Sequence, residues 1–307
     1  MEILIIGLGS IAQKHVDAIK SINPNAKITA LRSSKDSKPL KGVRDLYELD
    51  NLEEKPNFVI ISNPTIMHSS AILEASKWGV PLFIEKPPLD SMNSAEEILT
   101  KLEKSNINTY VAFNLRFHPC LEFIKEFLKT NISLLNEVNV YCGSYLPEWR
   151  ASGDYRKDYS ASKQMGGGVH LDLIHELDYC FWLFGEPIAT NGKFSKKSNL
   201  EIDSPDFAQY LLEYNGFFVN CTLNYYRRDS KRNLELVFDD FTVNVDLLKC
   251  EIIHSKLGVI FVRTDYQVSS LYEKQMRQFI DKLTSNAEFE PNFKDSLTVL
   301  RAALNIN

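Results

Sequence analysis

A glycine-rich turn near the start of the chain has the residue types that bind the phosphates of a dinucleotide. The run Gly7-Leu8-Gly9-Ser10-Ile11-Ala12 follows an apolar segment, Ile3 to Ile6, and opens an amphipathic one. The first glycine permits a tight turn, the second lets the backbone approach a pyrophosphate, and the small Ala12 lets a helix pack on the strand. The alternative is a glycine-rich turn without a ligand. We predict that the phosphates lie at the helix N-terminus and contact Gly7, Gly9, Ser10 and Ile11.

The end of the second predicted strand bears on which dinucleotide binds. About 20 residues beyond the glycines, an NAD site usually carries an acidic residue that binds the ribose hydroxyls. This chain has Arg32-Ser33-Ser34-Lys35 there. An arginine with serines can bind a 2′-phosphate, so Arg32 and Ser33 favour NADP over NAD, and the alternative is a solvated basic turn beside an NAD site.

Four further segments, together with the glycine turn, resemble one family. They are Ser62-Asn63-Pro64-Thr65 with His68, then Glu85-Lys86-Pro87, then Asn114-Leu115-Arg116-Phe117, and the glycine run that continues to Asp178, Gly166-Gly167-Gly168-Val169-His170-Leu171-Asp172-Leu173-Ile174-His175-Glu176-Leu177-Asp178. In this order they resemble the Gfo/Idh/MocA oxidoreductases, the glucose-fructose oxidoreductase and inositol dehydrogenase family. The resemblance covers essentially the whole chain.

The resemblance implies a catalytic lysine on the dinucleotide-binding half. It places Glu85 and Lys86 under the nicotinamide, with a cis bond between Lys86 and Pro87, and it adds Asn63, Pro64 and His68 to the cofactor contacts. A cation near the reacting oxygen stabilises the alkoxide that develops when an alcohol loses its proton and a hydride. Without the surrounding pattern, Lys86 would be interpreted as a surface lysine before a proline turn.

The resemblance also implies an acid and base pair in the second half of the chain. Asp172 and His175 are three positions apart, a spacing that predicts one shared helix face. An imidazole there can accept the proton, and a carboxylate can orient it or bind a sugar hydroxyl. A buried helix histidine satisfied by a neighbouring carboxylate is the structural alternative.

A segment rich in aromatic residues and arginines is predicted to line the substrate pocket. It consists of Tyr145-Leu146-Pro147-Glu148-Trp149-Arg150 and Tyr155-Arg156-Lys157-Asp158-Tyr159. Aromatic faces stack on sugar rings, and arginines bind carboxylates or phosphates. With Arg116 and His118 in the family's pattern, we expect Trp149, Arg150 and Tyr155 to help bind an anionic sugar, either a nucleotide sugar or a sugar acid. The alternative is a solvated loop.

The elements that must position these residues fall into two halves. Residues 1–118 alternate short apolar runs with amphipathic stretches, which predicts βαβ units and a doubly wound parallel Rossmann sheet. Residues 119–307 contain strand-like segments with turns such as Asn215-Gly216 and Asp239-Asp240, which predict an α+β domain with a mostly antiparallel sheet. We expect this domain to bind substrate and to form a homo-dimer or homo-tetramer through its sheet, and we allow for the C-terminal helix packing on the first domain.

Composition excludes several classes of protein. Hydrophobic residues make up 44% and charged residues 24% of the 307 residues, with a net charge of -5. This acidic balance argues against nucleic-acid binding, and no apolar run is long enough for a membrane span. Neither a signal peptide nor a C-x-x-C pair is recognisable, and no cysteine has metal-ligand spacing to a histidine. We therefore expect a cytoplasmic protein with reduced cysteines and no metal.

The predicted activity is hydride transfer between NAD(P) and a hydroxyl or keto group of a sugar, sugar acid or nucleotide sugar. A second possibility is a glycosidase that uses tightly held NAD transiently, as some members of the family do. A third is a non-catalytic sensor that binds dinucleotide and a protein partner. The presence of both Lys86 and His175 favours catalysis.

Overall fold

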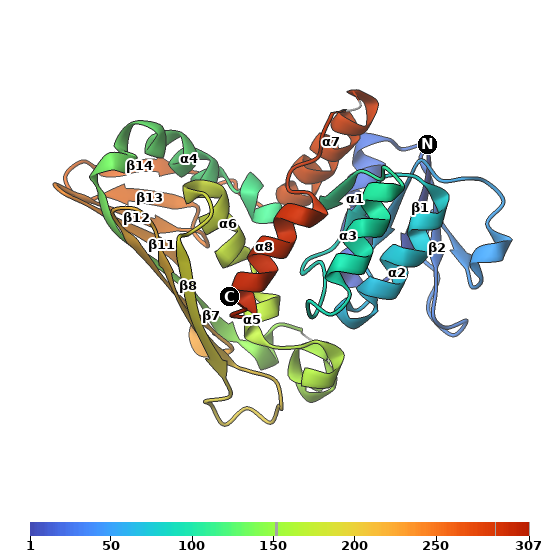
Figure 1. The fold of residues 1–307 in the computed structure, drawn as a ribbon, viewed down its shortest axis with the longest axis horizontal. Helices are drawn as coiled ribbons and strands as arrows, with labels where there is room; N and C mark the ends of the chain where they lie inside the picture. Colours follow the sequence, from blue (N-terminus) through green and yellow to red (C-terminus); the bar gives the residue numbers. More distant parts are fainter. Residues whose placement is uncertain (151–152, 286, 307) are drawn as a thin grey trace. The chain divides into compact units, whose positions relative to one another are not determined.

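The protein folds into two compact units. The computed structural model describes residues 1–150, 153–285 and 287–306. Unit 1 comprises Met1–Asn114 and Gln267–Thr298, and unit 2 comprises Leu115–Tyr266 and Val299–Asn307 (Figure 1). This division differs from the predicted boundary after residue 118 chiefly in the late segment 267–298, which belongs to unit 1.

Unit 1 contains a six-stranded parallel sheet in the order β3-β2-β1-β4-β5-β6. This is the strand order of a Rossmann fold, so the predicted doubly wound sheet is confirmed. The edge strand β3 was not predicted, because only its two end residues, Val43 and Leu46, are apolar. The strands are β1 (Glu2–Ile6), β2 (Lys27–Leu31), β3 (Val43–Leu46), β4 (Phe58–Ile61), β5 (Leu82–Ile84) and β6 (Thr109–Val111).

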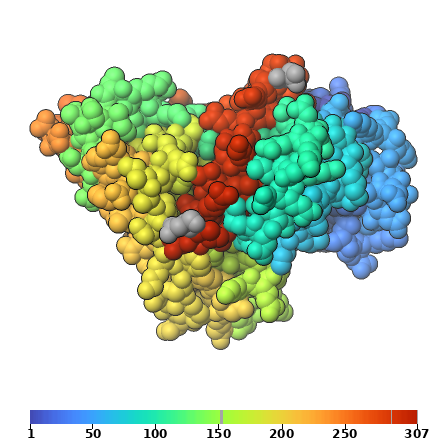
Figure 2. Space-filling model, in the orientation of Figure 1, coloured from blue at the N-terminus to red at the C-terminus, as the bar shows by residue number. Residues whose placement is uncertain are grey.

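Helices cover both faces of this sheet. On one face, α1 (Ser10–Ile22) and α7 (Ser269–Ser285) share an apolar core with the strands. The Phe279 ring of α7 lies 5.0 Å from Phe58 and 5.2 Å from Phe83. On the other face lie α2 (His68–Ala75) and α3 (Ala95–Lys104), which form an outer surface of the unit in Figure 2. The apolar strand residues are therefore buried on both sides, as a parallel sheet requires.

Unit 2 contains an eight-stranded sheet in the order β14-β13-β12-β11-β7-β10-β9-β8. All neighbouring strands of the described residues pair antiparallel except β7 and β10. The predicted hairpins β9–β10 and β11–β12 are confirmed. The strands are β7 (Leu135–Tyr145), β8 (Ala189–Ser195), β9 (Phe207–Glu213), β10 (Phe218–Asn224), β11 (Tyr226–Phe238), β12 (Thr242–Asp246), β13 (Glu251–His254) and β14 (Gly258–Val262).

One face of this sheet packs against helices. Helix α4 (Pro119–Asn131) lies across β13 and β14 (Figure 1), with the Phe123 ring 5.3 Å from Phe261. Helices α5 (Val169–Asp172) and α6 (His175–Phe184) follow the glycine run, and the unit boundary falls within α8 (Phe293–Ala303). Among the described residues, no helix is long and apolar enough to cross a bilayer. Short 3-10 helices occupy Leu49–Asn51, Thr65–Met67, Ser76–Trp78, Asn114–Phe117, Ile132–Leu134, Leu146–Glu148, Tyr155–Lys157, Tyr159–Ala161 and Lys163–Met165.

Candidate active site

The glycine turn of unit 1 has the local geometry of a phosphate-binding loop. Gly7 has a φ of +89°, and a Cβ there would lie 2.6 Å from the backbone N and Cα of Asn63. At Gly9, by contrast, a Cβ would meet no heavy atom of the described residues within 4 Å. Gly7 thus lets the loops after β1 and β4 approach each other, whereas Gly9 leaves space in front of α1.

The N-terminus of α1 fits an anionic group. Within the described part of the chain it has no side-chain cap and no acidic residue in its first turn. The first N–H groups of a helix have no partner within the helix, and the helix dipole favours negative charge there. Ser10 is exposed and Ile11 half-buried beside this end. The residues present therefore fit a dinucleotide whose pyrophosphate lies at Gly9 and Ser10.

The segment that carries Lys86 is held by a buried histidine that we did not predict. His15 of α1 is fully buried, and its Nε2 lies 2.5 Å from Glu85 Oε1. The other carboxylate oxygen of Glu85 accepts a hydrogen bond from the backbone N of Lys86 at 3.1 Å. The Lys86-Pro87 bond is cis, as the resemblance implied. A polar residue among the buried positions of α1 was the available signal for His15.

A second buried histidine connects two loops of the site. Nε2 of His68 lies 3.0 Å from the Asn63 carbonyl oxygen, and Nδ1 lies 3.0 Å and 3.2 Å from those of Pro87 and Pro88. Burial lowers the pKa of His68, although these carbonyls oppose the shift. Its ring therefore fixes the loop of Asn63 and Pro64 to the loop that follows Lys86.

Arg32 is engaged within the protein. Its Nη1 donates to Asp45 Oδ1 at 2.8 Å and its Nη2 to the Lys38 carbonyl at 3.2 Å. The Arg32 side chain is only 7% exposed, and the exposed Ser33 follows it. Asp45 lies on β3, the strand that was not predicted. The carboxylate beside Arg32 therefore comes from a part of the chain whose pairing the sequence did not reveal.

In unit 2, two tyrosines hold the carboxylate of Asp172. The hydroxyl of Tyr225 donates to Asp172 Oδ2 at 2.5 Å, and Tyr159 also hydrogen-bonds Asp172. The charge of Asp172 and burial raise the pKa of Tyr159, and burial foremost raises that of Tyr225. Both phenols therefore stay protonated and act as donors. Tyr159 ends the segment that was predicted to line the substrate pocket, whereas Tyr225 was not predicted because it is distant in sequence.

We expected Asp172 and His175 to share one face of a single helix, and this prediction was wrong. Asp172 ends α5 and His175 begins α6, with Leu173 and Ile174 between them. Hydrogen bonds of the i to i+3 type, Ile174 N to Leu171 O and Glu176 N to Leu173 O, occur at this break. The α-helical hydrogen-bond pattern is therefore interrupted between the two residues. Both side chains are buried, at 5% and 9% exposure.

Helix α6 is fixed by two buried ion pairs. Arg116 binds Asp178 through Nε and Nη2, with a shortest distance of 2.7 Å. Burial raises the pKa of Asp178, and the Arg116 guanidinium opposes this shift. Arg232 Nε donates to Glu176 Oε1 at 2.6 Å. Arg116, predicted to bind substrate, thus first serves to hold the helix that starts at His175.

The aromatic segment lies close to Asp172 through its tyrosine contacts. The Trp149 ring meets Tyr225 edge-on at 5.2 Å, and its Nε1 donates to Ser144 Oγ at 2.8 Å. Arg150 pairs with Asp158 and lies 5.6 Å from the Tyr159 ring centre. Trp149 therefore contacts Tyr225, and Arg150 contacts Tyr159, the two tyrosines that hydrogen-bond Asp172.

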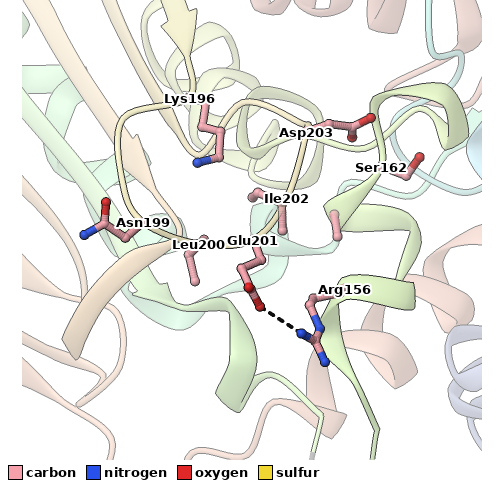
Figure 3. Close-up of a pocket in the computed structure, with 9 residues that line it drawn as sticks. Arg156, Ser162, Lys196, Asn199, Leu200, Glu201, Ile202 and Asp203 are labelled. Atoms are coloured by element: carbon pink, nitrogen blue, oxygen red, sulfur yellow. Dashed lines mark hydrogen bonds and ion pairs between the residues drawn. The ribbon is translucent and has the colours of Figure 1, made fainter.

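Tyr155 lies at a different place in unit 2. Its hydroxyl accepts a hydrogen bond from the Glu201 backbone N at 3.2 Å. Beside it is an open pocket of about 620 Å³, in which Arg156 pairs with Glu201 (Figure 3). Among the described residues, neither Asp172 nor His175 lines this pocket, which is formed by Arg156, Ala161, Ser162, Lys196, Asn199, Leu200, Glu201, Ile202 and Asp203. Tyr155 is therefore not grouped with Trp149 and Arg150.

His170, in the glycine run, is a buried neutral imidazole. It is 5% exposed and stacks on Phe194 with ring centres 4.1 Å apart. Its Nδ1 has no hydrogen-bond partner among the residues that the structure describes. Burial, with a smaller effect of the Lys163 charge, lowers the pKa of His170 to about 4.

This pKa predicts a loss of stability in acid. Between pH 6.5 and 4 the unfolded chain binds a proton at His170 that the native state does not, so the free energy of unfolding falls as pH falls. The loss amounts to at most about 3 kcal/mol. Urea unfolding of the parent and of His170→Gln at pH 7 and pH 4.5 measures it. The variant should show a weaker pH dependence, and equal dependence in both proteins would contradict the assignment.

Two sequence profiles match the two halves of the chain. Residues 1–113 match the oxidoreductase family with an NAD-binding Rossmann fold, and residues 135–244 match the GFO/IDH/MocA C-terminal domain. The chain belongs to the Gfo/Idh/MocA oxidoreductase family. The predicted family and its NAD-binding fold are thus confirmed.

Individual relatives in the Gfo/Idh/MocA family are distant. An uncharacterized oxidoreductase of Bacillus subtilis, YrbE, is 31% identical over 60% of this chain and 54% of its own length. The scyllo-inositol 2-dehydrogenase (NAD(+)) of the same organism is 25% identical over 61% of this chain and 54% of its own. The match thus spans about half the length of these relatives. The UDP-N-acetylglucosamine 3-dehydrogenase of Acidithiobacillus ferrooxidans shares the fold, with a TM-score of 0.79, 18% identity and coverage of 100% and 96% of the two chains.

Proposed function

We propose that the protein is an NAD(P)-dependent dehydrogenase acting on a hydroxyl or keto group of a sugar, sugar acid or nucleotide sugar. The observation that carries this proposal is the buried His15–Glu85 pair, which fixes the backbone of Lys86 to the helix that starts at the phosphate-binding turn. A lysine that served only to stabilise the fold would not need its backbone fixed to the phosphate-binding helix. The named dehydrogenases among its relatives act on inositol and on a UDP-linked sugar, which supports a carbohydrate substrate.

The cofactor contacts proposed are Gly7, Gly9, Ser10, Ile11, Ser33, Asn63, Pro64, Glu85 and Lys86. When bound, a nicotinamide cofactor supplies the hydride acceptor or donor. His68 acts by holding the loops of Asn63 and Lys86 together, since both its nitrogens face backbone carbonyls.

The chain's own residues handle the proton and the charge. We propose that the Lys86 ammonium stabilises negative charge on the reacting oxygen and that the His175 imidazole accepts or returns its proton. We propose that Asp172 binds a sugar hydroxyl or orients the imidazole. Its carboxylate accepts a hydrogen bond from the Tyr225 hydroxyl at 2.5 Å. Because Tyr159 and Tyr225 remain donors, Asp172 remains a fixed acceptor for a sugar hydroxyl or an imidazole N–H.

Trp149 and Arg150 are proposed to contact the substrate next to Asp172. The Trp149 side chain is 37% exposed and that of Arg150 45%. They leave an aromatic surface and a cation at the same place, which suits a sugar that carries a negative charge. Arg116 and Tyr155 were predicted to share this role, but the former is bound to Asp178 and the latter contacts Glu201.

We further propose a cytoplasmic homo-oligomer. The unit 2 sheet has a polar concavity of about 300 Å³ lined by side chains such as Asn139, Asn220 and Asn233. Several large apolar side chains of the strands are also exposed, namely Leu211, Phe218, Ile253 and Val259. Such a mixed surface is typical of an interface between subunits. The five buried free cysteines suit a reducing compartment.

The experiment that tests the function is a ligand screen. Purified protein is heated with NAD or NADP and with nucleotide sugars, sugar acids and cyclitols, and the nicotinamide absorbance is followed in parallel. Ligands that bind the native state raise the melting temperature. We expect a cofactor and a carbohydrate each to raise it, and the same carbohydrate to change the absorbance. Stabilisation by no dinucleotide would contradict the proposal.

The structure changes our expectation for the cofactor. The prediction of NADP required Arg32 donors for a 2′-phosphate, but Arg32 is paired with Asp45 and shielded, and the added carboxylate would repel a phosphate. We therefore propose NAD as the preferred cofactor.

Removing Asp45 should reverse this preference toward NADP. Asp45→Ala frees the Arg32 guanidinium, and we expect the ratio of kcat/KM for NADP to that for NAD to rise by about tenfold or more, since a charge-assisted hydrogen bond is worth about 1.5 to 3 kcal/mol, a factor of about 10 to 150. Arg32→Asp should lower the same ratio. Steady-state kinetics with both cofactors measure it. A parent protein that prefers NADP, with no gain in Asp45→Ala, would show that Arg32 already binds the phosphate.

A further inference from the structure

Three metal-ligating side chains meet in unit 2, apart from every residue of the proposed reaction. Cys120 is in the first turn of α4, His118 is the residue before that helix, and Cys250 is in the turn between β12 and β13. One ligand atom from each lies within 4.8 Å of the other two. All three are buried, with exposures of 0%, 1% and 0%. The fold thus brings together two thiols and an imidazole from segments 130 residues apart.

The distance between the two sulfurs suits a shared metal ion. Cys120 Sγ and Cys250 Sγ are 3.8 Å apart. A disulfide would need about 2.0 Å. Two thiolates bound to one zinc at about 2.3 Å with a tetrahedral angle would themselves be about 3.8 Å apart. The thiols now share a hydrogen bond at this distance, and the same separation suits two thiolates on one zinc.

One nitrogen of the imidazole has the partner that a metal-bound histidine usually has. His118 Nε2 donates to the Leu247 carbonyl oxygen at 3.0 Å, which fixes the ring and its tautomer. Its Nδ1 accepts the Cys120 backbone N–H at 3.2 Å, and this hydrogen bond would be exchanged for the zinc–nitrogen bond when the metal binds. Metal-bound histidines usually donate their other N–H to a carbonyl or carboxylate. The Leu247 carbonyl provides that partner.

The backbone conformation of Cys250 and the net charge of the three ligands are also compatible with a bound divalent cation. Cys250 has a φ of +54°, a conformation uncommon for residues other than glycine and asparagine. Residues held in uncommon backbone conformations cluster at functional sites, so this conformation is compatible with a ligand role for Cys250. Two thiolates, a neutral imidazole and a divalent cation have no net charge, so the set could be buried without an uncompensated ion.

We propose that His118, Cys120 and Cys250 form a zinc site that ties the start of α4 to the β12–β13 turn. Binding of Zn²⁺ forms two zinc–thiolate bonds and one zinc–imidazole bond, and the two thiol protons are released to solvent. The fourth position takes a water or small ligand, as in zinc sites with three protein ligands. The expectation of no metal rested on spacing along the chain, which does not report these contacts. The site is independent of the proposed dehydrogenase activity.

Elemental analysis of the intact protein tests the site. The full chain is purified without a metal-affinity tag from zinc-supplemented cells, dialysed, and analysed for zinc, copper and iron. We expect zinc in equimolar amount, and a loss of roughly tenfold or more in Cys120→Ser and Cys250→Ser. Cys221→Ser is the matched control, because Cys221 is an equally buried cysteine of the same unit and should leave the zinc content unchanged.

Cobalt binding gives a measurement that does not depend on folded variants. Chelator-treated parent protein is titrated with Co²⁺, and absorption from thiolate-to-cobalt charge transfer should rise to saturation and disappear when Zn²⁺ is added. A folded parent that retains no zinc after dialysis and shows no such absorption overturns the proposal. Equimolar copper in place of zinc overturns the assignment of the ion, and zinc retained equally in all three variants overturns the choice of ligands.

Discussion

Replacing Lys86 by alanine is expected to lower turnover by about 10²-fold or more, because the ammonium acts on charge that develops only during the reaction. Dinucleotide binding should remain nearly unchanged, since the pyrophosphate lies at the glycine turn. Steady-state kinetics and a fluorescence titration with cofactor measure the two effects separately. Lys77→Ala is the matched control, because Lys77 is an exposed lysine of unit 1 paired with Glu74.

His175→Ala should reduce turnover by a similar factor of about 10². Lys86 belongs to unit 1 and His175 to unit 2, so the two variants test whether both units contribute to catalysis. A loss in one variant alone would restrict the reaction to groups of one unit. Parent-like turnover in both, with cofactor bound, would refute the catalytic interpretation and favour a sensor.

Gly9→Val is expected to abolish dinucleotide binding while the protein stays folded. Gly9 has a φ of -87°, which valine can adopt, and a Cβ there meets nothing within 4 Å among the described residues. The isopropyl group would therefore fill space meant for the pyrophosphate without straining the protein. Isothermal titration with NAD and NADP measures binding, and circular dichroism checks the fold.

Gly7→Val is the informative comparison for this variant. Gly7 has a φ of +89°, and its Cβ would lie 2.6 Å from the Asn63 backbone, so this variant should lose stability as well as binding. Unchanged cofactor affinity in a folded Gly9→Val protein would show that the phosphates bind elsewhere.

Much of unit 1 could be predicted because strands such as β4 and β5 are apolar along their whole length. The runs Ile3 to Ile6 and Phe58 to Ser62 stand out, and the glycine turn marks the start of α1. Strands with polar residues were missed. Strand β8 reads Ala-Thr-Asn-Gly-Lys-Phe-Ser, and β13 has four residues. Their hydrogen bonds to neighbouring strands make them strands, and single-sequence periodicity does not report those partners.

Site residues that belong to a local sequence motif could be predicted. Site residues that are brought in only by tertiary contacts could not. Lys86 and His175 stand in recognisable segments, but His15 and Tyr225 are partners supplied by the fold. The same limit explains Arg32, whose pairing with Asp45 depends on β3. It also explains the helix break after Asp172, where a local change of hydrogen bonding overrides helical spacing.

Net cofactor turnover tests the central claim most directly. The carbohydrate that stabilises the protein is incubated with stoichiometric NAD or NADP, and both the nicotinamide absorbance and the carbohydrate product are measured. A dehydrogenase predicts one molecule of reduced cofactor for each molecule of substrate oxidised, or the reverse for a keto sugar. Substrate consumed with no net change in cofactor would contradict this account and indicate a glycosidase, and bound cofactor with no conversion would indicate a sensor.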